Sequence, residues 1–589
     1  MFRTVPLQRL ALPRVLPFAI VCALAACQSH EPTHEAPPLA DMIALPPPPP
    51  TAAAAPVAPP ASASLDSIVV TGSRVQHISA EKAAPVMALE TRAASGYVGN
   101  VAQQYEPREN TERYAEHRDN PVHRVSEEPV STFSIDVDTG SYANVRRMLR
   151  EGMRPPADAV RAEEMINYFD YGHPAPTSLD VPFRVTTELA AAPWNGKHQV
   201  LMIGIKGYDV PKAELPPANL VFLIDTSGSM QEPAKLPLLK RSFAKLVEQL
   251  RPQDRVSMVA YAGSAGVVLE PTPGSEKDTI LAALGKLEAG GSTNGGEGIR
   301  LAYAMAKQGW RKGGVNRVIL ATDGDFNVGV TDPKALETLV ADQRKNGVAL
   351  TTLGFGEGNY NDAMAEHLAD VGDGNHAYID TDQEARKVLV REMQATLLTI
   401  AKDVKIQIEF NPAQIAEYRL IGYENRVLAR EDFANDKVDA GDIGAGHEVT
   451  ALYELTPVGS GAEQLPPLRY GQAAPSKSDA RDGEFGHLRL RYKRPGEDAS
   501  RLIERAMLAS ELRATPSPTL RFAAAVAAYA DALRGGTHLG TWSWPDIARE
   551  ARATLGADPW HERAEFLELV DAARRTTAGD APQIGIGSD

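Results

Sequence analysis

The sequence has 589 residues but only two cysteines, Cys22 and Cys27, and both lie close to its start. Most of the chain therefore has no thiol with which to form a disulfide, bind a metal or attack a substrate. It also lacks the Gly-x-Ser-x-Gly turn of many hydrolases and the Walker A loop of nucleotide-binding proteins. Basic residues are outnumbered, with 61 Lys and Arg against 76 Asp and Glu, so the net charge is −15. This acidic balance argues against a nucleic-acid-binding protein.

The apolar run near the N-terminus, Val15–Leu24, is too short for a permanent membrane span. Three arginines lie in the 14 residues that precede it, so residues 1–26 are expected to be a secretory signal peptide. The sequence Leu24–Ala25–Ala26–Cys27 resembles the lipobox of bacterial lipoproteins. That resemblance implies cleavage before Cys27 and lipidation of its sulfur. An ordinary signal peptide with a chance cysteine is the alternative.

Cleavage before Cys27 would leave a single sulfur in the mature chain, and acylation would use it. No disulfide could then form, even in the oxidising cell envelope, and the fold would depend on its hydrophobic cores. Gln28 follows the cysteine, whereas an Asp at that position would resemble an inner-membrane retention signal. The sequence therefore predicts a lipid-anchored protein of the bacterial cell envelope, at the outer membrane.

Residues 27–115 are expected to be a disordered tether, because a run of five prolines at 46–50 and an Ala/Pro/Ser segment at 51–64 bury little apolar surface. The formal H-E-x-x-H match at 30–34 contains Pro32, which is incompatible with the helix that such a zinc site needs. A second short segment resembles the TonB box of outer-membrane receptors, which adds as a strand to a periplasmic partner. A β-prone patch in a linker is the alternative interpretation. The segment consists of Asp66, Ser67, Ile68, Val69, Val70 and Thr71.

The stretch Val221–Met230 organises the rest of the chain. Four apolar residues precede Asp-Thr-Ser-Gly-Ser, and a helix-compatible run follows, which predicts a buried strand, a polar turn and a helix. Asp225, Ser227 and Ser229 alternate, so the turn can direct three oxygens to one point. An oxygen-only cluster of this kind suits Mg²⁺ or Mn²⁺ rather than zinc. In open parallel α/β sheets, ligands bind beyond the carboxyl ends of the strands, where this turn would lie.

This stretch resembles the metal-ion-dependent adhesion site (MIDAS) of von Willebrand factor type A (VWA) domains, which combines a D-x-S-x-S turn with a distant Thr and a distant Asp. A Gly-rich loop supplies Thr293, and a second apolar strand ends in Asp323. The resemblance implies a divalent cation, Mg²⁺ or else Mn²⁺ or Ca²⁺. Its ligands would be Asp225, Ser227, Ser229, Thr293 and Asp323. Helix capping by Ser and Asp would explain the turn alone, but not three such parts in the family's order.

Residues 217–400 alternate strands and helices, which predicts a six-stranded, doubly wound, mainly parallel α/β sheet of the VWA or Rossmann-like kind. The strands are expected at 220–224, 255–261, 315–322, 349–354 and 376–379, with an antiparallel edge at 267–269. The helices are expected at about 235–250, 276–288, 295–309, 332–346 and 360–370, and a closing helix at 384–398.

Both flanks of this unit have a different pattern. Residues 116–216 resemble the N-terminal extension of one bacterial VWA subfamily, with strands at 132–137, 183–189 and 199–206 and helices at 138–150 and 163–171. Residues 401–500 have the period of two that is typical of antiparallel strands. Residues 501–580 are expected to be helical, from Arg501–Arg513 onward, and resemble the companion C-terminal domain of the same subfamily. The strands of the two flanks are expected to form one β-sandwich-like region into which the α/β unit is inserted.

Asp136 and Asp138 form a further acidic pair, just before the expected helix at 138–150. A second metal site is one interpretation of the pair. Capping of that helix by Asp138 or Ser141 is the favoured one.

The MIDAS resemblance implies a binding device rather than an enzyme, because neutral hydroxyl ligands leave the cation short of electrons and able to accept an acidic side chain of a protein partner. We therefore expect a membrane-anchored adhesion or assembly protein with no nucleic-acid partner. Three alternatives remain open: a Mg²⁺-dependent hydrolase, for which Asp325 is the nearest additional acid, a structural envelope protein with a vestigial site, and a TonB-linked component.

Overall fold

The computed structural model describes residues 112–116, 118–324, 333–358, 360–466 and 483–578. Cys27, the TonB-box-like segment at 66–71 and Asp325 lie outside these residues, so their predicted roles stay predictions. Within the described part of the chain, none of the helices combines the length and the apolar character needed to cross a membrane.

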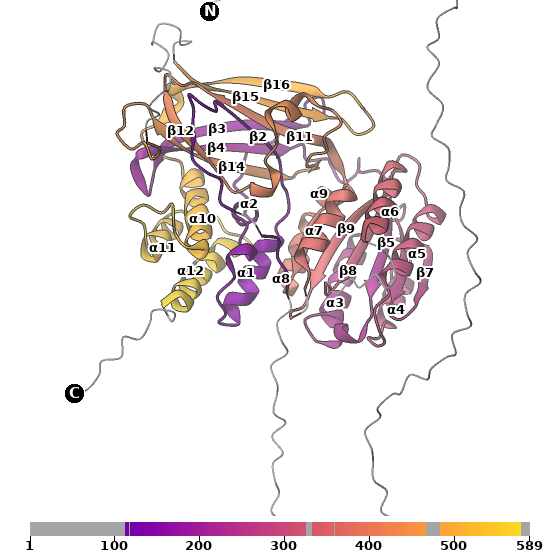
Figure 1. Ribbon diagram of the computed structural model, residues 1–589. Helices are drawn as coiled ribbons and strands as arrows, with labels where there is room; N and C mark the ends of the chain where they lie inside the picture. The colour runs from indigo at the N-terminus through magenta and orange to yellow at the C-terminus, as the bar shows by residue number, and fades with distance from the viewer. Residues whose placement is uncertain (1–111, 117, 325–332, 359, 467–482, 579–589) are drawn as a thin grey trace, which may run out of the picture. The chain divides into compact units, whose positions relative to one another are not determined.

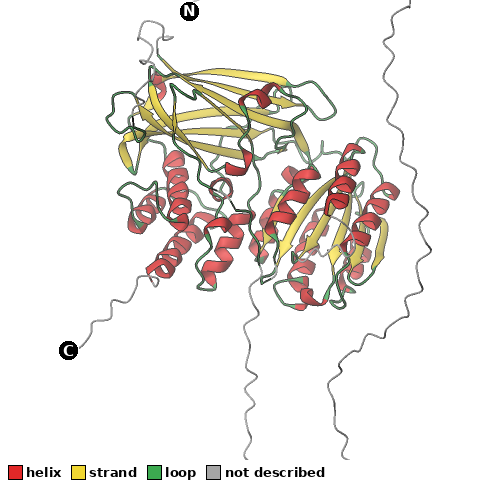
Figure 2. Cartoon of the chain, in the orientation of Figure 1, coloured by secondary structure: helices red, strands yellow, loops and turns green. Residues whose placement is uncertain are grey.

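The α/β unit is built on a six-stranded sheet in which all neighbours are parallel except the edge pair β6–β7 (Figures 1 and 2). Its central strand, β5, pairs with β8 on one side and with β6 on the other. The six-stranded, doubly wound fold expected from the sequence is therefore confirmed. In spatial order the strands are β10 (His376–Ile379), β9 (Ala349–Phe355), β8 (Val315–Thr322), β5 (Ala218–Asp225), β6 (Arg255–Tyr261) and β7 (Ala265–Pro273).

Every residue of β5 is buried, and its apolar side chains alternate between the two helical layers. Leu220, Phe222 and Ile224 pack against one set of helices, whereas Val221 and Leu223 pack against the other. The run 220–224 is buried on both faces and is apolar throughout, which is why the strand was recognisable in the sequence. The first face carries α3 (Leu236–Gln249), α4 (Lys277–Gly285) and α8 (Asp382–Arg386). The second carries α5 (Gly295–Gln308), α6 (Pro333–Lys345) and α7 (Asp362–Val371).

The closing helix expected at 384–398 is in fact divided. It consists of α8, the π-helical segment η3 (Lys387–Arg391) and α9 (Met393–Leu397). The amide of Glu392 donates to the carbonyl oxygen of Lys387 at 2.9 Å, which is the i→i+5 bond of a π-helix. The ammonium of Lys387 in turn donates to the carbonyl oxygen of Tyr168 at 2.7 Å. A contact with a residue more than 200 positions away was not visible in the local pattern.

Two further sheets combine strands from before and after the α/β unit. In the first sheet β4 pairs antiparallel with β14, and in the second β2 pairs antiparallel with β11, so the α/β unit is inserted between strands of one sandwich. The first sheet is β1 (His123–Arg124), β12 (Ile415–Ile421), β14 (Glu448–Pro457), β4 (Asn195–Gly207), β3 (Phe183–Ala192) and β17 (Leu512–Arg513). The second is β13 (Ile443–Gly444), β11 (Thr399–Phe410), β15 (Glu484–Lys493) and β16 (Arg501–Leu508), with β2 (Val130–Ser134) paired to β11.

Helices cover the outer face of the first sheet. Leu201 and Ile203 of β4 point into the sandwich core, whereas Val200 and Met202 point into a second core shared with the helices. The helices of this layer are α1 (Gly140–Arg150), α2 (Ala162–Asn167), α10 (Pro518–Arg534), α11 (Trp544–Ala553) and α12 (Glu562–Ala578). Because the first sheet is buried on both faces, it separates the two hydrophobic cores.

The prediction of a helix at Arg501–Arg513 is wrong. This segment contains β16, a short 3₁₀ turn and β17, and β16 pairs antiparallel with β15. The segment is rich in Leu, Ala, Met, Glu and Arg, which favour helix, but strand pairing and burial of Met507 in the sandwich core outweigh that local preference. The helical region therefore begins at α10 and not at Arg501. Helices α10, α11 and α12 are present as expected.

Arg146 joins three parts of the described chain. This guanidinium is 1 % exposed and donates to Asp380 Oδ2 at 2.8 Å, Glu384 Oε2 at 2.7 Å and Glu565 Oε2 at 3.1 Å. It thereby ties α1 to the α/β unit at α8 and to the C-terminal helix α12. Burial makes the network sensitive, because Asp380 and Glu384 lie beside this guanidinium almost without exposure to solvent, whereas Glu565 also pairs with Arg150.

Replacing Arg146 by Met should lower the free energy of unfolding by about 3–5 kcal/mol, since the apolar side chain leaves buried carboxylates without their cation. Urea denaturation monitored by circular dichroism measures the change. Arg241→Met is the matched control, because Arg241 and its partner Asp382 are both about half exposed and such pairs contribute about 0–1 kcal/mol. Equal losses for the two variants would contradict a structural role for the Arg146 network.

Candidate functional site

The Asp-Thr-Ser-Gly-Ser turn lies at the carboxyl end of β5, as expected. The strand ends at Asp225, the short 3₁₀ helix η2 (Gly228–Gln231) follows, and α3 begins at Leu236. Ser227 Oγ and Ser229 Oγ lie 3.1 Å apart, so the two hydroxyls share one side of the turn. The turn therefore presents two hydroxyl oxygens from residues that are two positions apart.

Asp225 is fully buried and is held in one orientation by three donors. Its Oδ1 accepts from the amide of Ser227 at 2.8 Å, and its Oδ2 accepts from the hydroxyls of Thr322 at 3.2 Å and Tyr261 at 3.3 Å. The amide bond closes the turn locally, whereas the hydroxyls come from the neighbouring strands β8 and β6. The position of this carboxylate is thus set by the sheet and by the turn together.

Asp323 follows the end of β8, the strand next to β5, and is also fully buried. Its Oδ2 accepts a hydrogen bond from Lys235 Nζ at 3.0 Å, and the Lys235 side chain is only 2 % exposed. The sequence analysis did not identify Lys235. It stands at the N-terminus of α3, where nothing in the local pattern indicates a contact with a residue 88 positions later.

The Gly-rich loop that carries Thr293 is bonded to the turn through its backbone. The amide of Gly228 donates to the carbonyl oxygen of Gly291 at 3.0 Å, and the amide of Gly290 donates to the carbonyl oxygen of Thr226 at 2.8 Å. Gly291 has φ = +87°, a conformation that favours glycine and lets the loop approach the turn. Thr293 lies two residues further on and is partly buried, just before α5 begins at Gly295.

Burial raises the pKa of Asp225 to about 6, and the charge of nearby Asp323 adds to this effect, whereas the hydrogen bonds from Ser227 and Thr322 oppose it. Two buried carboxylates at adjacent strand ends form a negative site, in which Lys235 supplies one positive charge. The oxygens of Asp225, Ser227, Ser229, Thr293 and Asp323 could hold a hard divalent cation, and a cation would relieve the repulsion between the carboxylates.

The favoured interpretation, in which Asp138 or Ser141 caps the helix, is wrong. The N-cap of α1 is Thr139, which makes no side-chain cap bond, and the hydroxyl of Ser141 donates to the carbonyl oxygen of Ala159. Asp138 Oδ1 instead accepts from the amide of His376 at 2.8 Å, and Asp136 contacts the guanidinium of Arg426 at 3.3 Å. Contacts with distant segments have replaced the local ones.

Three family models match the chain. The model for the von Willebrand factor type A domain covers residues 219–396, and one described as von Willebrand factor covers residues 108–202. A model described as the C-terminal part of the uncharacterized protein YfbK covers residues 395–576. VWA domains typically bind a divalent metal, and the family supports a role in protein interaction or as an adhesion scaffold.

Similar proteins include the uncharacterized protein YfbK of Escherichia coli (strain K12), which is 48 % identical over 500 residues that make up 84 % of this chain and 85 % of the relative. The uncharacterized protein sll0103 of Synechocystis is 31 % identical over 170 residues, which are 29 % of this chain and 39 % of that relative. A solved von Willebrand factor type A protein from Catenulispora acidiphila is 17 % identical and covers 66 % of this chain and 88 % of its own, at a TM-score of 0.36.

In the metal-free protein, ionisation of Asp225 should cost stability as the pH rises. The folded-state pKa of about 6 lies above the usual 3.8, so between these values the folded state binds more protons than the unfolded state. Stability from this group is therefore full below about pH 4 and is lost by pH 6, by up to about 3 kcal/mol. Urea denaturation in chelator from pH 4 to pH 7 should show a larger fall in the wild type than in Asp225→Asn, because other carboxyl groups with raised pKa values, such as Glu448, titrate in both proteins. Asp342→Asn, at a side chain 57 % exposed, should keep the wild-type curve.

Proposed function

Because the chain belongs to the YfbK family of bacterial von Willebrand factor type A proteins, we propose that it binds a protein partner through a divalent cation held at the turn after β5. The observation that carries this proposal is the pair of fully buried carboxylates, Asp225 and Asp323, at the ends of adjacent parallel strands beside two hydroxyls. A metal that keeps few charged ligands attracts a further acidic oxygen. The partner would supply that oxygen from an Asp or Glu side chain.

Mg²⁺ suits this donor set best, and Mn²⁺ or Ca²⁺ would use the same oxygens. Ser227, Ser229 and Thr293 would offer hydroxyl oxygens, and Asp225 and Asp323 would supply the negative charge. Lys235 would keep Asp323 oriented and would reduce the net negative charge of the site. The bound cation would provide an electrophilic position for the partner's carboxylate.

Binding is favoured over hydrolysis by the groups that contact the two carboxylates. They include the hydroxyls of Thr322 and Tyr261 and the ammonium of Lys235. The pKa of Tyr261 is raised well above its usual value, mainly by burial and then by Asp225. An alcohol, a phenol with a raised pKa and an ammonium are poor general bases, so these three contacts do not favour activation of water beside the metal.

Metal binding is tested by thermal and urea denaturation of the wild type in Mg²⁺, Mn²⁺ and chelator. With Mg²⁺ at about 100 times its Kd, the free energy of unfolding should rise by about 2.7 kcal/mol, because the cation binds only the folded state. Asp225→Ala should remove this gain and leave the fold intact, whereas the exposed-site control Asp342→Ala should retain it. Equal stability of the wild type in all three conditions would indicate a vestigial site in a structural protein.

Partner binding is tested with the same variants. Envelope extract passed over the immobilised full chain should yield a bound protein in Mg²⁺ that is absent in chelator and absent with Asp225→Ala. Replacing the acidic residues of the recovered partner one at a time should identify a single Asp or Glu on which binding depends. Retention that is independent of Mg²⁺ would contradict a metal-bridged contact.

We further propose that lipid on Cys27 anchors the protein to the outer membrane. The proposal is supported by the lipobox-like sequence before Cys27 and by Gln28 at the following position. Mass spectrometry of the mature N-terminus should find Cys27 as the first residue with acyl chains attached, and Cys27→Ala should move the protein to the soluble fraction. A mature protein that begins at another residue without lipid would overturn the anchoring.

A further inference from the structure

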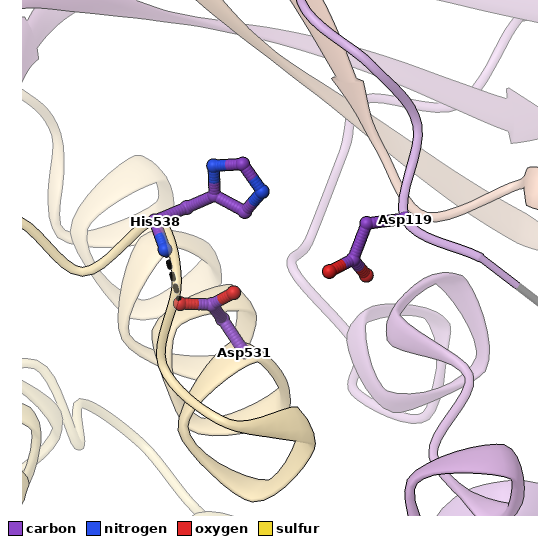
Figure 3. A group of neighbouring side chains, drawn as sticks. All are labelled: Asp119, Asp531 and His538. Atoms are coloured by element: carbon purple, nitrogen blue, oxygen red, sulfur yellow. Dashed lines mark hydrogen bonds between the residues drawn. The ribbon is translucent and has the colours of Figure 1, made fainter.

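Three side chains with metal-binding atoms meet outside the turn after β5. Asp119 comes from the segment that precedes β1, Asp531 from α10, and His538 from the turn that follows α10. One ligand atom from each lies within 4.8 Å of the others. Figure 3 shows the imidazole of His538 and the carboxylates of Asp119 and Asp531 facing a shared space from separate segments. Asp531 and His538 are seven positions apart, but Asp119 lies more than 400 positions before them, so only the fold brings it to the other two.

The shared space is part of a small cavity of about 30 Å³, which exceeds the roughly 10–15 Å³ needed for one water molecule. Arg419 also lines this cavity and is only 8 % exposed. Its Nη2 donates to Glu454 Oε2 at 2.8 Å, but its Nε has no hydrogen-bond partner among the described residues. A buried N–H group without an acceptor is costly, so an oxygen bound beside it would stabilise this side chain.

The charges around the cavity are negative in sum. Four carboxylates and two guanidinium groups are involved: Asp119, Glu424, Glu454, Asp531, Arg419 and Arg534. Arg534 is shared between Asp119 and Glu424, and Arg419 pairs with Glu454, which also binds His198. Even with a proton on His198, the carboxylates outnumber the cations. A divalent cation would supply the missing positive charge.

We propose that Asp119, Asp531 and His538 form a binding site for a divalent transition metal, with zinc as its best match. One imidazole and two carboxylates are a donor set that zinc accepts, and three protein ligands leave one position open. A water or hydroxide in that position would provide the acceptor that Arg419 Nε lacks.

This site differs from the turn after β5 in chemistry and in consequence. The turn offers oxygens and suits Mg²⁺, whereas the site at His538 includes a nitrogen and suits zinc. The metal would fix the segment around Asp119 onto α10. The neighbouring Asn120 already docks that segment, because its Nδ2 donates to the carbonyl oxygens of Gly422 at 2.6 Å and Leu420 at 3.2 Å. The inference does not rest on the proposed function.

The test uses the full chain, freed of metal and carrying Asp225→Ala so that the turn does not contribute. Calorimetric titration with Zn²⁺ should show one bound ion, and Co²⁺ in its place should give a visible absorption band. His538→Ala should weaken Zn²⁺ binding at least about tenfold and remove the band. The matched control is His367→Ala, at a half-exposed histidine on α7 that contacts Glu337. It should bind Zn²⁺ as the parent does.

Asp119→Asn is a second variant, at a partly exposed side chain where loss of the fold is not expected. It should also weaken Zn²⁺ binding. Circular dichroism confirms that each variant is folded. Absence of Zn²⁺ binding by the parent would overturn the proposal. So would parent-like affinity of folded His538→Ala and Asp119→Asn, or an equal loss in His367→Ala, which would indicate adventitious binding to surface histidines.

Discussion

Two like charges at the ends of adjacent parallel strands are the constraint on which the α/β unit depends. Asp225 and Asp323 are fully buried, so water does not screen them from each other. Three donors orient Asp225 and the ammonium of Lys235 compensates Asp323. The alternation of apolar side chains along β5 fixes the strand between two helical layers. It therefore fixes the carboxylates at a place where burial, and then the charge of Asp323, raise the pKa of Asp225. A fold that keeps this arrangement is suited to a cation at that edge.

The elements that the sequence predicted well are those whose pattern is local. Parallel strands such as β5 and β8 are continuous apolar runs, and their ends are marked by polar turns. The elements that it predicted badly depend on distant partners. β16 consists largely of helix-forming residues and is a strand because β15 offers an edge. The π-helical break at Lys387 accompanies a hydrogen bond to Tyr168, far away in the sequence.

The same distinction applies to the sites. The turn at Asp225, Ser227 and Ser229 is a contiguous motif, and the sequence alone was enough to select it. Lys235 was not predicted as a site residue, because its partner Asp323 is 88 residues away and its own neighbours in sequence resemble an ordinary helix start. Asp119 and His538 were not predicted for the same reason. They are even further apart in sequence, and nothing in either segment indicates a contact with the other. Long-range pairs of single residues carry no local period.

The inserted architecture limits how the turn after β5 can move. α3 begins directly after Lys235. It packs in the same core as Ala385 of α8 and Leu389 of the π-helical segment η3. Glu384 of α8 is held by Arg146, and Arg146 also binds α12 through Glu565. A swing of the α/β unit away from the sandwich helices would have to break these buried contacts of Arg146. A partner that bound the turn would meet it on this base, so little of the binding free energy would be lost in ordering the domain.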